Sequence, residues 1–552
     1  MRTKKLFLIL AVCISILFTS CSYLNLGEND DSKDNEYNFL DSEDDVIDIG
    51  PVRGGVLKLY STNPDTLNPI LTNNKYVRDY SAFVFESLVT LDRSQKAVPT
   101  LAKSWEVSDD GLTWTFHLEE NVFWHDNMPF TAEDVEFTIN AIISSPNSSY
   151  KPNVSNITMF SAIDRKTFRI VLKNPNSFTA ELMTFPILPK HYFEGEEFAS
   201  SPKNNSPMGT GPYKFAEYSP GQYVKLKSNE NWWKGEQDNN NDLKIPYIQE
   251  IEIRLYDKTK SGTDAFQGGD VDLLTIDRSL WSKYNGRTDI TMKKYTSNEF
   301  EYIAFNMSNK ILKLPEVRQA IAYAVDKTRI ISNLLPGEAV ASDLPLIPDT
   351  WLNDTNAVFY SPDKEKARKL LEDGGWKESN GLMYKRINGV NTALKLEMLV
   401  NEDNSTRLKV AEEIKNQLKE IGIELTINKL KWDEEMKRIE RKRFDMVFIG
   451  CQITSVPDIS FLYSSESGQL NISGYKNEEV DEYLRKITME KNDDVKKSYY
   501  SKLKELINQD VPYLGLYFYN EAVVYSKRIK GEFNPYLWNK YFDFVRWYTP
   551  MI

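Results

Sequence analysis

The sequence predicts an α/β protein with more than one domain. Its 552 residues exceed the length at which a single hydrophobic core usually stops growing. In the second half, a strand pattern at Leu394–Val400, a helix pattern around Val410–Ile421 and a strand pattern at Ile423–Ile427 follow one another. This β-α-β order is typical of a parallel sheet. The stretch Glu86–Ser206 is richer in hairpin signals, so we expect an α+β region beside the α/β part.

The first elements of the folded body follow from local patterns. Gly54–Tyr60 alternates and contains β-branched character, which predicts a strand. Asn63–Pro69 contains two prolines and two asparagines and predicts a loop. Arg78–Leu88 has apolar residues at helical spacing, so we expect a helix there.

A hairpin is predicted between residues 105 and 118. Asp110-Gly111 supplies the turn signal, because this dipeptide suits the backbone conformation of tight hairpins. Trp114, Phe116 and Leu118 alternate along the second strand and should share one buried face.

Later helices and strands carry clear start and stop signals. Thr131–Asp134 predicts a helix start, with a capping threonine and acids in the first turn. Tyr302–Asn306 predicts a strand, and a helix with an early Pro315 should follow it. Ser361-Pro362 should open another helix that ends at Gly374-Gly375. The apolar stripe expected on the helix after Pro315 consists of Val317, Ile321, Ala324 and Val325.

The N-terminus has the pattern of a signal peptide. Basic residues in Met1–Lys5 precede the apolar run Leu6–Phe18, which is too short to cross a bilayer comfortably as a permanent helix. Phe18–Cys21 resembles a bacterial lipobox, with Phe18 in place of the usual leucine, and this resemblance implies that Cys21 is lipidated. The alternative is an ordinary cleaved signal in which Cys21 is incidental. Residues 21–52 are polar and acidic, which predicts a flexible tether.

Composition and cysteine count exclude several functions. The net charge of −12 argues against nucleic-acid binding, which needs a cationic surface. The three cysteines are Cys13, Cys21 and Cys451, so removal of the signal leaves one thiol in the folded body and no internal disulfide. Cys451 could be a nucleophile or a small buried side chain, and the second interpretation is favoured. The three histidines lack metal-ligand spacing, so we predict no metal site and no cofactor.

Enzyme signatures are also missing. Gly209–Pro212 lacks the downstream Gly-Lys-Ser/Thr of a phosphate loop, and no Gly-x-Ser-x-Gly motif occurs. The sequence contains 80 acidic residues, so neighbouring carboxylates carry no information about acid–base catalysis. We therefore predict no catalytic residue.

Four stretches together resemble the family 5 extracellular solute-binding proteins, which include the oligopeptide- and dipeptide-binding proteins. The first, Pro99–Val135, is the most specific and contains Asp109-Asp110-Gly111-Leu112-Thr113-Trp114. The resemblance extends from about Arg53 to the C-terminus. The other stretches are Gly209–Phe215, Tyr302–Asn306 with Val317–Asp326, and Lys366–Trp376.

The resemblance implies a two-lobed, periplasmic-binding-protein-like (type II) fold with an extra α+β insertion domain. A ligand would lie between the lobes and favour their closure, because it contacts both lobes only in the closed form. The expected divisions are residues 1–20 for the signal peptide, 21–52 for the tether, 53–85 with 206–300 and 519–552 for the first lobe, 86–205 for the insertion, and 301–518 for the second lobe.

The implied function is solute capture for an ABC importer. The expected ligand is a peptide, delivered to a permease and ATPase complex by a monomer anchored through lipid to the outer face of the cytoplasmic membrane. Three alternatives stay open: a receptor for a signalling peptide, a binder of a non-peptide solute such as a metal chelate or saccharide, and an extracellular hydrolase. The sequence offers no nucleophile–base pair for the hydrolase.

The resemblance also implies ligand contacts in three parts of the chain. One is the loop after the first strand, one begins at a tryptophan in the second lobe, and one lies near the return to the first lobe. Gly450-Cys451-Gln452 matches a backbone stretch that pairs with an extended peptide. The side-chain candidates are Asn73, Asn74, Lys75, Trp432, Tyr517 and Tyr519.

Position 454 departs from the family pattern. Peptide-binding members commonly carry an aspartate there that pairs with the ligand's ammonium, whereas this chain has Thr454 and its nearest later acid is Asp458. Ile439 and Phe448 stand where oligopeptide-binding members can carry arginines that face a ligand carboxylate. We therefore expect Thr454 to contribute at most a hydrogen bond, and binding to depend on backbone pairing, stacking by Trp432 and apolar contacts.

Overall fold

The computed structural model describes residues 50–235, 243–257, 261–353 and 359–550. The predicted signal peptide, the lipidation at Cys21 and all but the last three residues of the predicted tether lie outside the described residues. No helix among the described residues is long and apolar enough to span a membrane.

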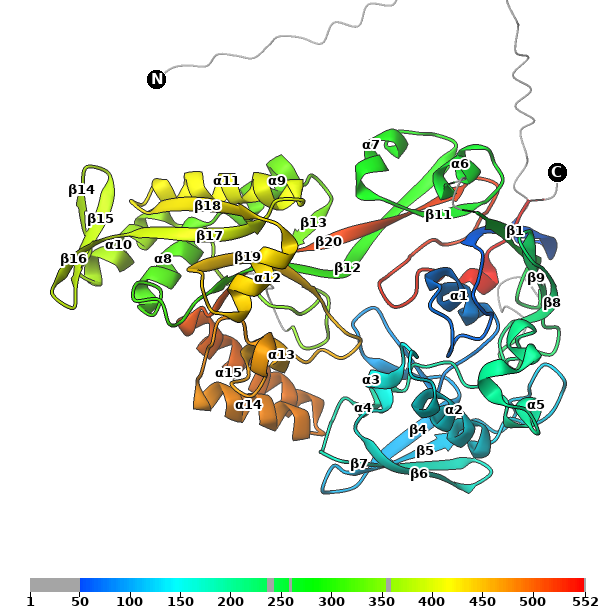
Figure 1. The fold of residues 1–552 in the computed structure, drawn as a ribbon. Helices are drawn as coiled ribbons and strands as arrows, with labels where there is room; N and C mark the ends of the chain where they lie inside the picture. Colours follow the sequence, from blue (N-terminus) through cyan, green and yellow to red (C-terminus); the bar gives the residue numbers. More distant parts are fainter. Residues whose placement is uncertain (1–49, 236–242, 258–260, 354–358, 551–552) are drawn as a thin grey trace, which may run out of the picture. The chain divides into compact units, whose positions relative to one another are not determined.

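One mixed sheet of eleven strands organises the described chain (Figure 1). Its strands are β1 (Gly54–Thr62), β8 (Tyr213–Ser219), β9 (Tyr223–Ser228), β10 (Ile248–Tyr256), β11 (Leu273–Ile276), β12 (Ile290–Phe305), β13 (Ala339–Ala341), β17 (Lys395–Asn401), β18 (Glu424–Leu430), β19 (Met446–Gln452) and β20 (Tyr513–Ser526). Their order is β18-β17-β19-β12-β20-β11-β1-β10-β9-β8, and β13 pairs with β20.

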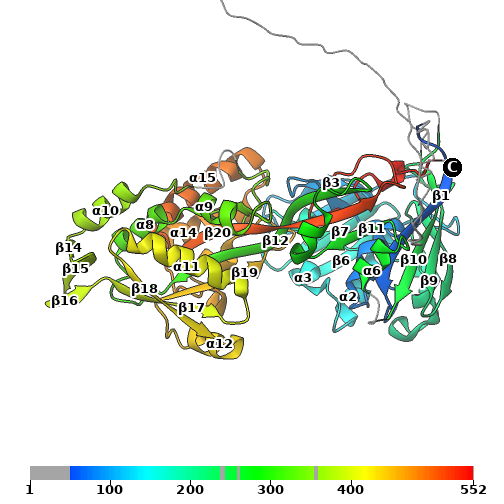
Figure 2. The same cartoon turned by 90° about the horizontal axis from the view of Figure 1, so that it is seen from above.

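Strands β12 and β20 run side by side through the middle of this sheet (Figure 2). Their pairing is irregular between Thr296 and Phe300, and it resumes with Phe300 opposite Phe518. The predicted boundaries between the lobes, at 300/301 and 518/519, therefore fall inside two continuous paired strands. The division into lobes stays a prediction.

A separate antiparallel sheet confirms the hairpin-rich region. Its order is β4 (Ala102–Val107), β5 (Thr113–Leu118), β7 (Thr167–Leu172) and β6 (Ile157–Asp164). Gly111 has a φ of +71°, which glycine adopts without strain, so the predicted turn forms there. The three alternating residues of β5 are buried, as predicted.

The predicted helix starts and the β-α-β unit are also confirmed. Helix α2 (Ala132–Ser144) begins after Thr131, whose reciprocal hydrogen bonding with Asp134 completes a capping box. The apolar stripe of α8 (Pro315–Ala324) is buried. Strands β17 and β18 are parallel, with α11 (Ser405–Lys419) between them in the chain. Helix α10 (Lys364–Asp373) starts slightly later than predicted, because Asp363 is its cap.

The helix predicted at Arg78–Leu88 is shorter and lies earlier in the chain. Helix α1 (Lys75–Tyr80) begins after Asn74, whose side chain accepts a hydrogen bond from the amide of Tyr76, and a 3-10 turn at Ser81–Phe83 follows. The chain then leaves helical geometry because the carbonyl of Val84 accepts from the amide of Gly211 at 2.9 Å. A tertiary hydrogen bond thus ends the helix before its apolar pattern does.

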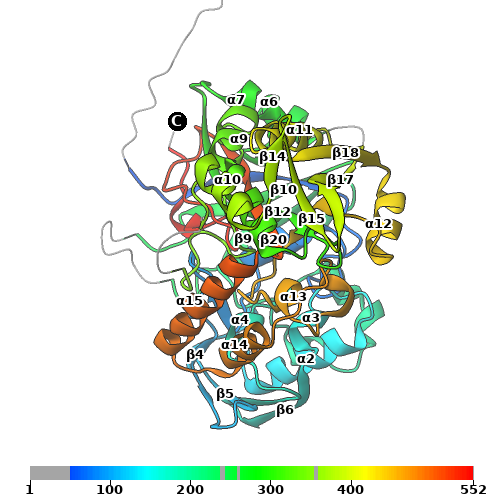
Figure 3. The same ribbon diagram turned by 90° about the vertical axis from the view of Figure 1, so that its left-hand side faces the viewer.

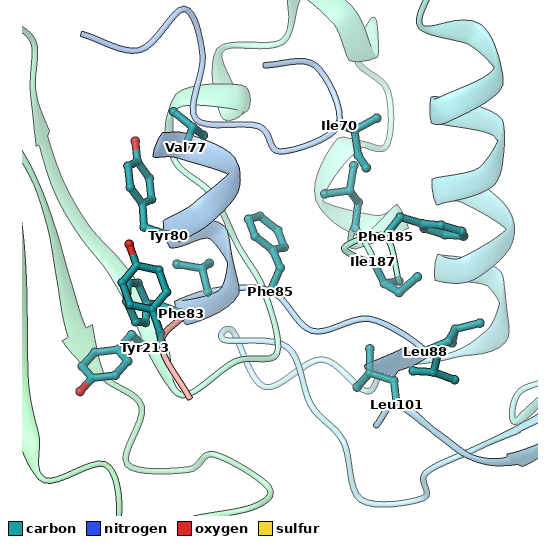
Figure 4. Packing of buried hydrophobic residues seen from close by; sticks show 14 of the residues in the cluster. Ile70, Val77, Tyr80, Phe83, Phe85, Leu88, Leu101, Phe185, Ile187 and Tyr213 are labelled. Atoms are coloured by element: carbon teal, nitrogen blue, oxygen red, sulfur yellow. The ribbon is translucent and has the colours of Figure 1, made fainter. Parts of the chain in front are cut away.

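Apolar packing fixes this first segment in place (Figure 4). Val77, Phe83 and Phe85 from the α1 segment join the same buried cluster as Tyr213 of β8 and Phe185. Each large side chain buried in this way stabilises the fold by roughly 1.5–3 kcal/mol. The packing therefore holds the exposed face of α1 at a defined position.

The remaining elements surround these sheets. The remaining strands are β2 (Val89–Leu91), β3 (Ala97–Pro99), β14 (Lys377–Ser379), β15 (Leu382–Ile387) and β16 (Val390–Ala393). The remaining α-helices are α3 (Lys151–Val154), α4 (Thr179–Leu182), α5 (Lys190–Phe193), α6 (Gly262–Gln267), α7 (Trp281–Tyr284), α9 (Lys327–Leu334), α12 (Trp432–Glu440), α13 (Ser460–Tyr463), α14 (Glu478–Met489) and α15 (Asp493–Asp510).

Candidate ligand-binding cleft

Two adjoining cavities form the candidate site. The larger has a volume of about 1000 Å³ and is lined by the α1 segment, the loop after β11 and residues near the C-terminus. The smaller has a volume of about 570 Å³ and is lined by β12, β19, β20 and the start of α11. Asp277, Arg278 and Glu299 line both cavities, so the two are neighbours.

The smaller cavity collects the carboxyl ends of three strands. Residues 277–279 follow β11, Asn404 and Thr406 follow β17, and Gly450–Gln452 end β19. Ligands commonly bind outside the carboxyl ends of strands in open α/β sheets, because loops and helix starts meet there. This position therefore suits ligand binding.

A buried ion pair borders the smaller cavity. Arg407, on the first turn of α11, donates from Nε to Oε2 of Glu301 at 2.7 Å and from Nη2 to Oε1 at 2.8 Å. Gly450 makes room for this pair, since a Cβ atom there would lie 2.6 Å from Glu301 Oε1 and 2.8 Å from Arg407 Nη2. Burial raises the pKa of Glu301, and the charge of Arg407 opposes this shift.

A second buried carboxyl group, that of Glu435, lies within reach of the charge of Arg407. Glu435 on α12 is fully buried, and neither of its oxygens has a hydrogen-bond partner within the described residues. Burial raises the pKa of Glu435 to about 7, and the charge of Arg407 acts in the opposite direction. Glu435 is therefore partly protonated near neutral pH.

A second arginine separates the two cavities. Arg278 donates from Nη2 to Glu299 at 3.0 Å, and its guanidinium lies 3.8 Å from the ring centre of Tyr519. Tyr519 lines the smaller cavity. Tyr517 lies wholly within the hydrophobic core and reaches neither cavity.

Only one of the three residues predicted in the first loop reaches the site. Lys75 lines the larger cavity. Asn74 caps α1, and its side-chain amide donates to Thr62 Oγ1 at 3.1 Å. The backbone amide of Asn73 donates to Asp65 at 2.8 Å. The two asparagines shape the loop, and neither lines a cavity of the cleft.

The predicted backbone stretch does line the smaller cavity. Pairing of β19 with β17 ends at Val400 and Phe448, whereas its pairing with β12 continues to Glu299 and Gln452. Within the described residues, the last part of β19 thus has no strand partner on the β17 side. Burial raises the pKa of Cys451 to about 12, so this thiol stays protonated, which supports the structural interpretation over the nucleophilic one.

The predicted tryptophan and threonine lie outside both cavities. Trp432 begins α12 with 44% of its surface exposed and lines neither cavity. The carbonyl of Thr454 accepts from Gln95 Nε2 at 3.0 Å. Asp458 accepts hydrogen bonds from the amide and hydroxyl of Ser460, so its carboxylate is engaged in a local turn.

The two positions that could have carried arginines are apolar core. Ile439 and Phe448 are buried in hydrophobic clusters. The guanidinium of Arg407, however, lies 5.9 Å from the ring centre of Phe448. The guanidinium of Arg407, from α11, therefore lies close to position 448.

The sequence interpretation missed the charged residues that line the cleft. These are common residue types in a chain with 148 charged side chains, so composition does not single them out. One local signal was available: Glu301 lies between Phe300 and the predicted strand Tyr302–Asn306, so it interrupts an apolar run. The missed residues include Arg78, Asp277, Arg278, Glu299, Glu301, Glu338 and Arg407.

His125 has a structural role. His125 Nδ1 accepts from the amide of Gly209 at 3.2 Å, and its Nε2 lies 3.1 Å from the carbonyl oxygen of Gly211. Burial lowers the pKa of His125 to about 4, so the ring is neutral. Among the described residues, no group of three or more histidine, cysteine or acidic side chains is arranged to hold a metal ion.

Residues 96–471 match the family model described as bacterial extracellular solute-binding proteins, family 5 Middle. The oligopeptide-binding protein AppA of Bacillus subtilis is 26% identical over 501 residues, which cover 87% of this chain and 89% of AppA. Heme-binding protein A of Haemophilus influenzae is 28% identical over 479 residues, which cover 81% of this chain and 84% of that protein.

Solved structures have the same fold. The ABC transporter substrate-binding protein CtaP of Listeria monocytogenes matches with a TM-score of 0.71 and 26% identity, over 90% of this chain and all of CtaP. NikZ of Campylobacter jejuni, solved with Ni(L-His), matches with a TM-score of 0.62 and 26% identity, over 90% of this chain and 99% of NikZ.

Proposed function

Because the chain belongs to the bacterial extracellular solute-binding proteins of family 5, we propose that it captures a peptide for an ABC importer. Its relatives include proteins named for oligopeptide and dipeptide binding. Others are named for heme binding or were solved with a nickel–histidine complex, so ligand chemistry varies among similar proteins. The choice of a peptide therefore needs support from the cleft itself.

The unpaired edge of β19 is the observation that carries the peptide proposal. Gly450–Gln452 line the smaller cavity, and β17 does not pair with them. An extended peptide can add to such an edge through main-chain hydrogen bonds, which do not depend on its sequence. The volumes of the two cavities fall within or near the range of ordinary ligand pockets, about 300–1,000 Å³.

The charges of the cleft support recognition without an anchor at position 454. Arg407 and Arg278 are each paired with a glutamate, so neither is an isolated positive charge. Neither Thr454 nor Asp458 lines the two cavities, and Asp458 accepts a hydrogen bond from the amide of Ser460. Backbone pairing and contacts with Tyr519 would then supply most of the binding energy, which suits internal or blocked peptide segments.

Capture would act through closure of the predicted lobes and without chemistry. The smaller cavity takes residues 277–279 from the predicted first lobe and Gly450–Gln452 from the predicted second lobe. A ligand that contacts both sets shifts the population toward the closed form. The neutral thiol of Cys451 offers no nucleophile, so the ligand should be released intact.

Family membership places the protein outside the cytoplasm, and we propose lipid anchoring at Cys21 on the outer face of the cytoplasmic membrane. Residues 21–52 would tether a monomeric body to that lipid. The closed, liganded form would then meet its permease and ATPase complex.

The test combines ligand identification with a blocked strand edge. Mass spectrometry of the purified protein should detect a co-purifying peptide, and calorimetry should then measure its affinity. Gly450→Ala should weaken binding at least tenfold, because the new methyl group displaces Arg407 and Glu301 beside the edge. Gly268→Ala, on a glycine that lines neither cavity, is the matched control. A co-purifying heme, metal chelate or saccharide would contradict the peptide proposal. Equal peptide affinities of the wild type, Gly450→Ala and Gly268→Ala would contradict it too.

A further inference from the structure

Helices α14 and α15 lie beside strands β4 and β5 of the predicted insertion (Figure 3), and a third cavity, of about 280 Å³, is lined by residues of both parts. Its walls come from β4, β5 and the segment 175–181 on one side, and from residues 489–496 on the other. It shares no lining residue with the two cavities of the cleft. This third cavity is therefore a separate space.

Direct contacts hold its two walls together. The amide of Ser177 donates to the carbonyl of Thr488 at 2.7 Å. Lys96 Nζ donates to Asp493 Oδ2 at 2.6 Å. Phe178 is buried in the same hydrophobic cluster as residues of α14 and α15. The cavity is thus a space of defined shape within a packed contact.

Two buried polar atoms on the insertion wall lack a hydrogen-bond partner within the described part of the chain. Glu181 is 6% exposed, and its Oε2 has no hydrogen-bond partner among the described residues. Trp114 is 5% exposed, and its indole Nε1 is likewise unpartnered there. Both residues line the cavity. Burial raises the pKa of Glu181, and the nearby charge of Lys496 acts in the opposite direction.

The opposite wall carries a buried ammonium group. The side chain of Lys496 is 3% exposed, and its nearest carboxylate oxygen, on Asp493, lies 4.0 Å away. Its Nζ also lies 4.6 Å from the ring centre of Phe178 and 5.4 Å from that of Trp351. Burial lowers the pKa of Lys496. No hydrogen bond from this ammonium is found within the described residues.

Glu181 and Lys496 thus border one small cavity, and within the described residues neither Glu181 Oε2 nor Lys496 Nζ has a hydrogen-bond partner, although Lys496 lies 4.0 Å from Asp493. Buried charges in this condition are unfavourable, and a group of opposite charge removes much of the penalty. The volume is just below that of ordinary small-molecule pockets, about 300 Å³ at their lower limit.

We propose that this cavity is a second ligand site that binds a small zwitterion, with its ammonium on the Glu181 carboxylate and its carboxylate on Lys496. This site lies outside the proposed peptide cleft and does not depend on it. A zwitterion fits better than a single ion, because a buried carboxyl side chain, Glu181, and a buried ammonium side chain, Lys496, both border the cavity. Occupancy would also join the insertion to α14 and α15.

The test is calorimetry on the full chain with a series of zwitterions of increasing length: glycine, β-alanine, γ-aminobutyrate and ε-aminocaproate. At least one should bind saturably, and methylamine and acetate should bind at least tenfold more weakly. Glu181→Gln and Lys496→Met should each weaken that binding at least tenfold. Glu106→Gln and Lys486→Met, on exposed side chains that do not line the cavity, are the matched controls and should leave it unchanged.

Two further variants distinguish loss of zwitterion binding from an effect of the peptide cleft and from a folding defect. Gly450→Ala should retain zwitterion binding, whatever it does to peptide affinity. Glu181→Asp keeps the negative charge but shortens the side chain by one methylene group; it is the second variant if Glu181→Gln fails to fold, and it should also weaken binding. The proposal is overturned if no zwitterion binds at millimolar concentration, if the single ions bind equally well, or if Gly450→Ala alone abolishes the binding.

Discussion

The guanidinium of Arg407 holds the carboxylate of Glu301 through two hydrogen bonds, at 2.7 and 2.8 Å. This pair connects the first turn of α11 to β12, one of the two long central strands. The side chains of Arg407 and Glu301 are only 12% and 6% exposed, so the interaction is largely shielded from water. The pair therefore joins a wall of the cleft to the strand that passes between the predicted lobes.

Removing one partner should destabilise the protein strongly. Arg407→Met leaves the Glu301 carboxylate buried and unpaired, and we expect a loss of about 3–5 kcal/mol in the free energy of unfolding. Arg407→Met combined with Glu301→Gln should recover part of that loss, because residue 301 then no longer carries a buried charge without a partner. Urea unfolding checks both variants. Lys395→Met breaks an exposed pair with Glu424 and should change the value by about 1 kcal/mol or less. Equal effects of Arg407→Met and Lys395→Met would contradict this role.

Glu435 should make stability depend on pH. Its folded pKa is raised to about 7 from an ordinary 4.5, so the folded state holds this proton more tightly than the unfolded state does. Wild-type protein therefore loses stability as pH rises from about 4.5 to 7, and Glu435→Gln removes that loss. At pH 8 the variant should be more stable by on the order of 2 kcal/mol. The difference should vanish near pH 4. Urea unfolding at both pH values measures this, and a variant that is less stable at pH 8 would show that the carboxylate has a stabilising partner.

Peptide affinity should not depend on a charged N-terminus held near position 454. Calorimetry with one peptide, free and N-acetylated, should give nearly equal affinities, because Thr454 carries no charge and Asp458 is bound to Ser460. Asp458→Asn should leave both affinities unchanged. A loss of roughly 2–5 kcal/mol on acetylation, reproduced by Asp458→Asn, would instead identify Asp458 as the ammonium anchor.

Lipid anchoring predicts a change of location. Wild-type protein should fractionate with the membrane, and Cys21→Ala should remove the lipid attachment and release the mature protein or stall its processing. Cell fractionation with mass spectrometry of the N-terminal peptide measures this. Cys451→Ala is the control, because that thiol lies in the folded body. Wild-type protein that is already soluble and free of lipid would favour the alternative of an ordinary signal peptide.

Local patterns were sufficient for much of the fold. The hairpin around Gly111, the cap at Thr131 and the parallel β17-α11-β18 unit follow from turn chemistry, capping and periodicity, which act over a few residues. The exception is the helix expected at Arg78–Leu88, which ends early because Val84 bonds to Gly211, far along the chain. A residue's local propensity carries no information about such a distant partner.

The sequence by itself determined the class of protein and the absence of an acid at position 454, and it predicted ligand binding along the backbone stretch Gly450–Gln452. Tertiary structure decided which side chains meet in the cleft. Arg407, Glu301 and Gly450 come from three separate segments and approach one another only because β19 pairs with β12 and α11 begins beside them. The same holds for Glu181 and Lys496, whose separation in the chain hides that both line one cavity. Charge and burial become informative only when these segments are packed, because an ionisable side chain responds to its surroundings in space.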